Sequence, residues 1–193
     1  MSDLVIDWTP KARAVLDAAE DLFYAHGIHA VGVEAIAERA GVTKKTLYDR
    51  FGSKERLVVE YLTARDRRWR EFLASQLDEA GPDPRSRLRA VFDASAAWTA
   101  ERGGKGCSMI NAHAEVSDPT HPAYPVIVGQ KRWMLELFVS IVADARGKDD
   151  RRQRAIAESL MLLHEGALVA AGMNTLRQPF DRACGLAVDL LDR

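Results

Sequence analysis

Apolar residues recur at intervals of three and four along almost the whole chain of 193 residues. This is the spacing of an amphipathic helix, and no stretch alternates for long enough to indicate a half-buried strand. The pattern therefore predicts an all-α fold of about nine helices. One of the predicted helices, residues 44–51, is so short that it needs packing partners to be stable in water.

Capping residues and glycines predict where the helices begin and end. Thr9 and Pro10 begin the first helix, and Gly27 ends it. Thr43 caps the third helix, which Gly52 ends. The later helices are expected after Ser53, from Asp83 to Gly103 and Gly104, and over residues 107–116, 125–146, 150–172 and 180–191, the last two as an antiparallel pair.

The stretch AGPDPRS, residues 80–86, interrupts the helical pattern with two prolines and a glycine. It indicates a boundary in the chain. We accordingly expect an N-terminal domain over about residues 9–69 and a C-terminal domain over residues 80–193.

The third predicted helix has two different faces. Leu47 and Phe51 lie on one side, where they can pack on the second helix and on the first. The other side presents cations and hydroxyl groups close to a helix N-terminus, which is phosphate-binding chemistry. Its residues are Lys44, Lys45, Thr46, Tyr48 and Asp49.

Charge is balanced over the chain, with 27 basic and 28 acidic residues, so a nucleic-acid surface has to be local. Between residues 39 and 56, six basic side chains meet only Asp49 and Glu55, an excess of four. Two short helices joined through Gly41 with a basic outer face indicate a DNA-binding helix-turn-helix, at about residues 32–51. A solvated polar face, or an interaction module without DNA binding, is the alternative.

The run ARAVLDAAEDLFYAHGIHAVGVEAIAERAGVTKKTLYDRFGSKERLVVEYL resembles the N-terminal domain of the tetracycline-repressor (TetR) family. The resemblance covers about the first 65 residues. It implies a three-helix DNA-binding domain followed by a helical ligand-binding and dimerisation domain. It further implies a homodimer that represses transcription until a small molecule binds. An activator and a ligand-independent regulator of the same family are the alternatives.

The resemblance also assigns DNA contacts. On the recognition helix, Thr43, Lys44, Lys45, Thr46 and Tyr48 are the expected base and backbone contacts, and Lys54 the expected phosphate contact at the start of the next helix. One departure is that the second helix starts in the sequence AVGV, residues 30–33, where the family often has threonine or serine. We expect a weaker cap there and one phosphate contact fewer.

Large apolar and histidine side chains on the C-terminal helices are candidates for an effector pocket. They are Trp98, Met109, His113, Trp133, Met161 and His164. Plain core packing is the alternative for each of them. The segment CSMINAHAEVSDPTHPAY, residues 107–124, is similar to one found in many family members.

The last two predicted helices are candidates for the dimer interface, because small and apolar residues allow helices to approach closely. The expected contacts are Leu162, Gly166 and Ala170 on one helix and Leu186 and Leu190 on the other. These positions could instead serve only the core of the chain itself.

Other classes of protein find little support in the sequence. His113, His121, His164 and Cys107 lack metal-ligand spacing, and no nucleophile or dinucleotide motif indicates an enzyme, so we expect neither metal nor cofactor. Cys107 is either a redox-sensing thiol or a buried inert one. The two cysteines, the absence of a signal-peptide pattern and the charges in the longest apolar runs indicate a cytoplasmic protein without a membrane segment.

Overall fold

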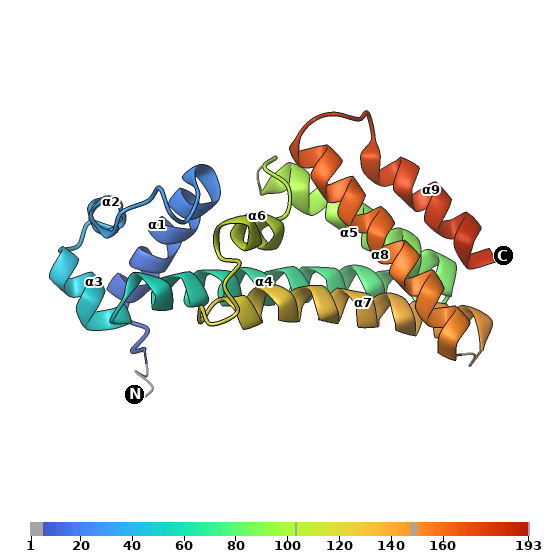
Figure 1. Ribbon diagram of the computed structural model, residues 1–193, viewed down its shortest axis with the longest axis horizontal. Coiled ribbons are helices and arrows are strands. Elements are labelled where there is room, and N and C mark those ends of the chain that lie inside the picture. Colours follow the sequence, from blue (N-terminus) through green and yellow to red (C-terminus); the bar gives the residue numbers. More distant parts are fainter. Residues whose placement is uncertain (1–5, 103, 148–149, 193) are drawn as a thin grey trace. The chain divides into compact units, whose positions relative to one another are not determined.

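The computed structural model describes residues 6–102, 104–147 and 150–192, and this part of the chain is helical without any strand (Figure 1). The all-α prediction is thereby confirmed. The helices are α1 (Pro10–His26), α2 (Val33–Arg39), α3 (Lys44–Phe51), α4 (Lys54–Ala80), α5 (Pro84–Glu101), α6 (Ser108–Glu115), α7 (Tyr124–Arg146), α8 (Asp150–Gly172) and α9 (Pro179–Asp192).

The predicted caps are confirmed. The side chain of Thr9 accepts a hydrogen bond from the backbone N–H of Ala12 at 3.3 Å, and Asp83 accepts one from Ser86 at 2.9 Å. Each satisfies a backbone donor that the first turn of a helix leaves without a partner. At the other end of α5, the helix stops at Glu101, and the predicted end at Gly103 lies outside the described residues.

The chain folds into two compact units. The first runs to Asp66 and also contains Ser108–Val128, and the second contains Arg67–Cys107 and the chain from Gly129 onward. Residues 108–128, which we expected in the C-terminal domain, thus pack with the N-terminal helices. The turn before Pro84 lies inside the second unit, so the prolines mark a helix boundary and not the division of the chain.

The core of the first unit explains how α3 persists. Leu47 and Phe51 are fully buried, and α3 contacts both α1 and α2. Trp8 adds an edge-on aromatic contact to Phe51, with ring centroids 6.2 Å apart. Tertiary packing, rather than helix propensity, therefore holds this short helix in place.

The second unit is built around α5, α8 and α9, together with the later parts of α4 and α7. Its core includes Phe92 of α5, Phe138 of α7 and Leu160 of α8. Helices α8 and α9 lie side by side and run in opposite directions, as predicted (Figure 1).

By length and composition alone, helix α8 could cross a membrane over Arg151–Gly172, and one such helix is weak evidence for a membrane segment. A core helix passes the same test, and α8 packs against α5 and α9. The helix is accordingly explained by packing in the second unit.

Candidate functional site

Helices α2 and α3 form a helix-turn-helix. The chain turns at Gly41, whose φ of 65° suits a residue without a side chain, and the N–H of Val42 donates to the carbonyl of Ala37 at 2.9 Å. Thr43 then caps α3 by accepting from the N–H of Thr46 at 3.1 Å. Helix α2 begins at Gly32 without a side-chain cap, as the departure from the family pattern predicted.

The predicted DNA contacts lie on the surface of the first unit. Thr43, Lys44, Lys45 and Tyr48 are exposed, and Thr46 and Lys54 are half-buried. The Lys45 side chain is 83% exposed. The hydroxyls of Thr43 and Thr46 lie 2.9 Å apart and hydrogen-bond to each other. These residues combine ammonium and hydroxyl groups on and beside α3, and their contacts with DNA remain a prediction.

Both lysines of α3 are paired with acids. Lys44 binds the carboxylate of Glu34 on α2, and Lys45 Nζ lies 2.7 Å from Asp49 Oδ2 one turn further along α3. The hydrogen bond between Lys44 and Glu34 raises the pKa of the lysine and lowers the pKa of the glutamate. Both groups are therefore charged at neutral pH, and the exposed pairs can be exchanged for other ionic contacts.

The excess of four positive charges counted along residues 39–56 is offset in the folded chain by acidic side chains from outside this segment. Glu34 pairs with Lys44, as described above, and three further acidic residues pair with the arginines of the segment. The pairs join Arg39 to Asp21 at 3.1 Å, Arg50 to Asp7 at 3.0 Å and Arg56 to Glu60 at 2.9 Å. A count along the chain missed these partners because they are distant in sequence or belong to neighbouring turns.

Lys54 differs from the other cations of this region. Its Nζ lies 6.0 Å from the ring centroid of Phe23, within the range of a cation–π contact. Ser53 caps the same helix by accepting from the N–H of Arg56 at 3.1 Å. Lys54 thus stands at the N-terminus of α4, where backbone N–H groups also favour an anion.

Glu115, at the end of α6, holds the loop between α1 and α2. Its carboxylate accepts hydrogen bonds from the backbone N–H of Ile28 at 2.8 Å and of His29 at 2.6 Å. At the beginning of α6, Ser108 accepts from the buried guanidinium of Arg65, which also pairs with Glu20 at 3.3 Å. Sequence reasoning missed these contacts, which tie α6 to α4 and to the loop that follows α1.

The six candidate pocket residues are divided between the two units, and their role in binding an effector remains a prediction. Met109 and His113 belong to the first unit, whereas Trp98, Trp133, Met161 and His164 belong to the second. Trp98 packs on Trp69 and Phe72, with ring centroids 5.5 Å apart in each case. For Trp98 the contacts favour core packing.

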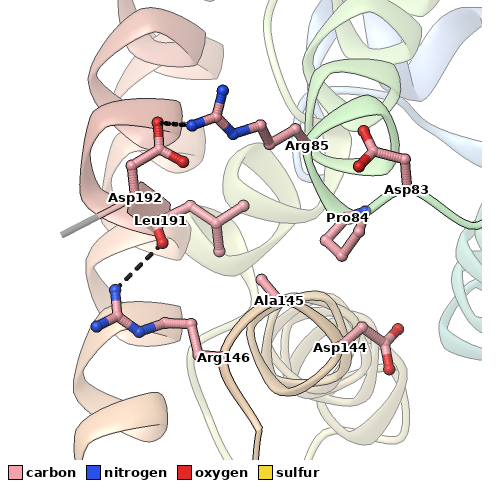
Figure 2. Close-up of a pocket in the computed structure, with 8 residues that line it drawn as sticks. All are labelled: Asp83, Pro84, Arg85, Asp144, Ala145, Arg146, Leu191 and Asp192. Atoms are coloured by element: carbon pink, nitrogen blue, oxygen red, sulfur yellow. Dashed lines mark hydrogen bonds and ion pairs between the residues drawn. The ribbon is translucent and has the colours of Figure 1, made fainter.

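Two cavities of the second unit are lined by other residues. One, of about 510 Å³, is bounded by residues 83–85, 144–146 and 191–192 (Figure 2). Three of its charged side chains are already engaged, because Arg85 pairs with Asp192 and Arg146 donates to the carbonyl of Leu191. The other, of about 490 Å³, lies between α5 and the loop that joins α8 to α9.

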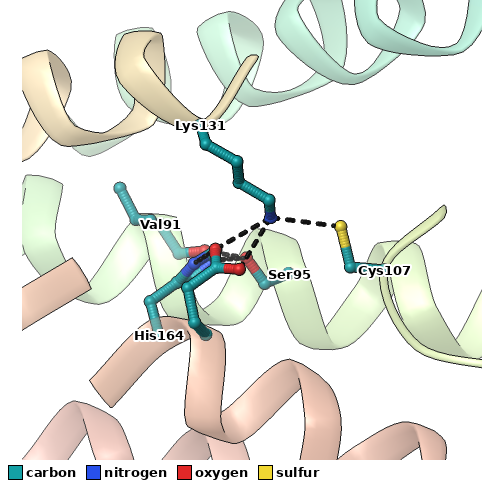
Figure 3. A network of polar contacts seen from close by, with 6 residues as sticks. Val91, Ser95, Cys107, Lys131 and His164 are labelled. Carbon is teal, nitrogen blue, oxygen red and sulfur yellow. Dashed lines mark hydrogen bonds and ion pairs between the residues drawn. The ribbon is translucent and has the colours of Figure 1, made fainter. Parts of the chain in front are cut away.

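His164 and Ser95 are the buried members of a polar cluster whose other side chains, Glu165, Lys131 and Cys107, are half-buried (Figure 3). The Nε2 of His164 lies 2.9 Å from the hydroxyl of Ser95, and its Nδ1 lies 3.5 Å from Glu165. Glu165 in turn pairs with Lys131 at 2.7 Å, and Lys131 donates to the sulfur of Cys107 at 3.3 Å. Burial lowers the pKa of His164 and keeps its ring neutral.

Among the described residues, no group of three or more His, Cys, Asp or Glu side chains is arranged to hold a metal ion.

The outer sides of α8 and α9 carry exposed apolar residues. Leu162 is 73% exposed and Leu186 is 55% exposed, and Gly166 and Val169 are exposed on α8. Ala170 is buried and Leu190 half-buried against the core of the unit. Of the predicted interface positions, these two are thus less accessible than Leu162, Gly166 and Leu186, and the interface itself remains a prediction.

Comparison with known proteins gives consistent matches. The sequence profile of the family described as "Bacterial regulatory proteins, tetR family" matches residues 15–61. An HTH-type (helix-turn-helix) transcriptional regulator of Mycobacterium tuberculosis is 30% identical over 190 residues, which covers 86% of this chain and 94% of the relative. The HTH-type transcriptional activator FasR of Mycolicibacterium smegmatis is 33% identical over 152 residues, or 77% of this chain and 66% of FasR.

The fold has a solved counterpart. The crystal structure of SCO4454, a TetR-family transcriptional regulator from Streptomyces coelicolor, superposes with a TM-score of 0.82 and 28% identity. The match covers 95% of this chain and 87% of that one.

Proposed function

The chain belongs to the TetR family of bacterial regulatory proteins and is a DNA-binding transcriptional regulator, and from this premise we propose that it is a homodimeric repressor released from its operator by a small molecule. The family is one of regulators and not of enzymes. The observation that carries the proposal is the polar outer face of α3, which a buried inner face holds in position. The site of action is the cytoplasm, where bacterial operators are located.

In this proposal the outer face of α3 enters the major groove of double-stranded DNA. Lys45 donates to guanine edges, and Thr46 contacts a thymine methyl group or a phosphate. Thr43, Lys44, Tyr48 and Lys54 contact the backbone. On binding, Lys44 and Lys45 exchange Glu34 and Asp49 for phosphate and base oxygens, which is feasible because both ion pairs are exposed.

Mobility-shift titration with an operator selected from random DNA tests this assignment. Lys45→Ala should weaken operator binding by about tenfold and relax sequence preference at one position. Lys54→Ala should weaken binding to all sequences and lower the salt slope by about one. Unchanged binding by both variants would refute the assignment of the interface.

The exposed apolar face of α8 and α9 supports the proposed homodimer. Leu162 and Leu186 are large apolar side chains in water, and exposed Gly166 allows a second helix to come close. Leu162→Glu should convert the dimer to a monomer in sedimentation analysis. Ser140→Glu, at an exposed position of α7, is a matched control for added charge. A Leu162→Glu protein that stays dimeric would contradict this interface.

The direction of regulation has a specific second candidate. FasR, similar over most of this chain, is named a transcriptional activator, so activation is the alternative to repression. A reporter gene placed behind the selected operator distinguishes the two. Repression predicts that deletion of this protein raises expression, and activation predicts that it lowers expression.

A further inference from the structure

Large apolar side chains that stay exposed occur in two places among the residues that the structure describes. Five of them lie on α8, on α9 or in the loop between these two helices. The other two are aromatic and belong to the first unit, Trp8 with 40% and Tyr48 with 39% of its surface exposed. Tyr48 is a predicted DNA contact on α3. Trp8, in the segment before α1, is exposed to a similar extent beside the same helix.

We propose that Trp8 is a further DNA contact, whose indole N–H donates to a phosphate oxygen of the operator backbone beside α3. This contact rests on the α3 interface of the proposed function and extends that interface to the segment before α1. Tryptophan combines a large apolar ring with one N–H donor, so it suits a position where one side of the ring is packed and the other meets a polar partner. A phosphate oxygen supplies the acceptor that the indole N–H requires.

The segment before α1 holds Trp8 against the last turn of α3. The rings of Trp8 and Phe51 meet edge-on, with centroids 6.2 Å apart, and Phe51 itself is buried. On one side of Trp8 in the chain, the Oδ2 of Asp7 lies 3.0 Å from Nη1 of Arg50 on α3. On the other side, Thr9 caps α1. The indole is therefore in place before DNA binds, and little conformational entropy is lost when the contact forms.

The neighbours of this position favour a phosphate as the partner. Phe51, on which Trp8 packs, lies one helical turn after Tyr48 and three residues before Lys54. Tyr48 supplies a hydroxyl group, and Lys54 supplies an ammonium group at the N-terminus of α4, where backbone N–H groups also favour an anion. Both are predicted contacts to the DNA backbone. Trp8 adds a neutral donor to this set, and a DNA strand that meets Tyr48 and Lys54 passes beside it.

The acidic residue next to Trp8 does not oppose a phosphate at this position. The carboxylate of Asp7 forms an ion pair with the guanidinium of Arg50, so the two charges offset each other at the edge of α3. Trp8 itself is neutral, and its contact with a phosphate adds affinity without releasing a counterion from the DNA. The contribution of Trp8 should therefore be independent of salt, unlike that of a lysine.

A purely structural role of Trp8 makes a different prediction. Packing on Phe51 requires only an aromatic ring, which phenylalanine and tyrosine also supply. A contact with phosphate requires in addition a hydrogen-bond donor on the ring, which tyrosine has and phenylalanine lacks. The substitutions Trp8→Phe and Trp8→Tyr thus separate the two roles.

Fluorescence anisotropy titrations of the full chain with labelled DNA, at several salt concentrations, compare both variants with the parent protein. Trp8→Phe should weaken binding about fivefold, because one hydrogen bond to a charged oxygen is lost. The loss should be similar for the selected operator and for unrelated DNA, and the salt slope should stay unchanged. Trp8→Tyr should recover most of the affinity. Lys54→Ala, which removes a cation, should instead lower the salt slope by about one.

Tryptophan fluorescence of the unsubstituted chain gives a second measurement, which does not depend on the folding of a variant. The other three tryptophans, Trp69, Trp98 and Trp133, belong to the second unit. Acrylamide, a neutral quencher, reaches the exposed ring of Trp8 in the free protein. Operator DNA should reduce this quenching, and the reduction should be absent in Trp8→Phe.

The outcomes separate this inference from the proposed function. Trp8→Phe that binds operator as tightly as the parent, a loss that Trp8→Tyr does not recover, or acrylamide quenching that operator leaves unchanged would each overturn the contact. Unchanged operator binding by both Lys45→Ala and Lys54→Ala would instead overturn the α3 interface on which it rests.

Discussion

Lys44 and Lys45 in the first unit and Lys131 in the second are each paired with a carboxylate, but their surroundings differ. The pairs of Lys44 and Lys45 are exposed, whereas the pair of Lys131 lies among buried groups and is bound to a thiol and, through Glu165, to a histidine. An exposed pair exchanges partners easily, and a buried pair is costly to break. The same residue type can therefore serve DNA binding in one unit and hold a polar cluster together in the other.

The largest effect is expected from breaking the half-buried pair of Lys131 and Glu165, whose side chains are 22% and 23% exposed. Lys131→Ala leaves the carboxylate of Glu165 without its cation and should lower the free energy of unfolding by about 3 kcal/mol. Urea unfolding measures this change. Lys45→Ala, which removes an exposed partner of Asp49, is the matched control and should leave the unfolding midpoint unchanged. Equal effects of the two variants would show that the comparison is wrong.

Glu115 is expected to have the next largest effect, within the first unit. Glu115→Ala removes the acceptor of two backbone N–H groups and should destabilise the unit by about 2 kcal/mol. Hydrogen exchange at the amides of Ile28 and His29 should rise most. Exposed Glu38 offers a control in Glu38→Gln, whose exchange pattern should match that of the parent protein. Unchanged protection at both amides in Glu115→Ala would refute the loop contact.

A smaller difference between the two units is expected in how their histidines make stability depend on pH. Burial lowers the pKa of His164, so below the ordinary histidine pKa of about 6.5 the unfolded chain binds a proton that the folded chain excludes. Stability should be constant above that pH and fall as pH decreases from 6.5 to 5, by up to about 1.4 kcal/mol per pH unit. His164→Asn should flatten this decrease, and exposed His113→Asn should not. The same slope in both variants would contradict the assignment.

The smallest effect concerns the exposed pair on α2 and α3. Glu34→Gln frees Lys44 from its partner before DNA arrives, so operator binding should tighten by about two- to threefold at low salt. Anisotropy titrations at two salt concentrations measure it, and the gain should shrink at the higher one. Weaker binding by this variant would mean that Glu34 contributes to the interface directly.

Local signals in the sequence predicted much of the fold. Thr9, Thr43 and Asp83 act within their own first helical turns, so side-chain type and position sufficed to place three helix starts. The burial of Leu47 and Phe51 followed from the helical period. The family resemblance then supplied the function, which the comparisons confirmed at the level of a DNA-binding regulator.

Contacts between residues that are far apart in the chain could not be predicted from the sequence. The partner of Arg50 is Asp7, and Glu115 reaches the loop at Ile28, so neither pairing leaves a periodic signal. The polar cluster around Lys131 likewise joins residues that are far apart in the sequence, from α5, α7, α8 and the segment before α6. Residues 108–128 were assigned to the C-terminal domain because nothing in their composition indicates that they pack with the first.

The central claim is that two copies of α3 read one operator together, and hydroxyl-radical footprinting of the protein on its selected operator tests it most directly. A dimer predicts two protected patches on one face of the duplex, with centres about 10 base pairs apart or a multiple of that spacing. Both patches should disappear together in Leu162→Glu at limiting protein concentration. A single patch, or two patches that are lost independently, would contradict the account.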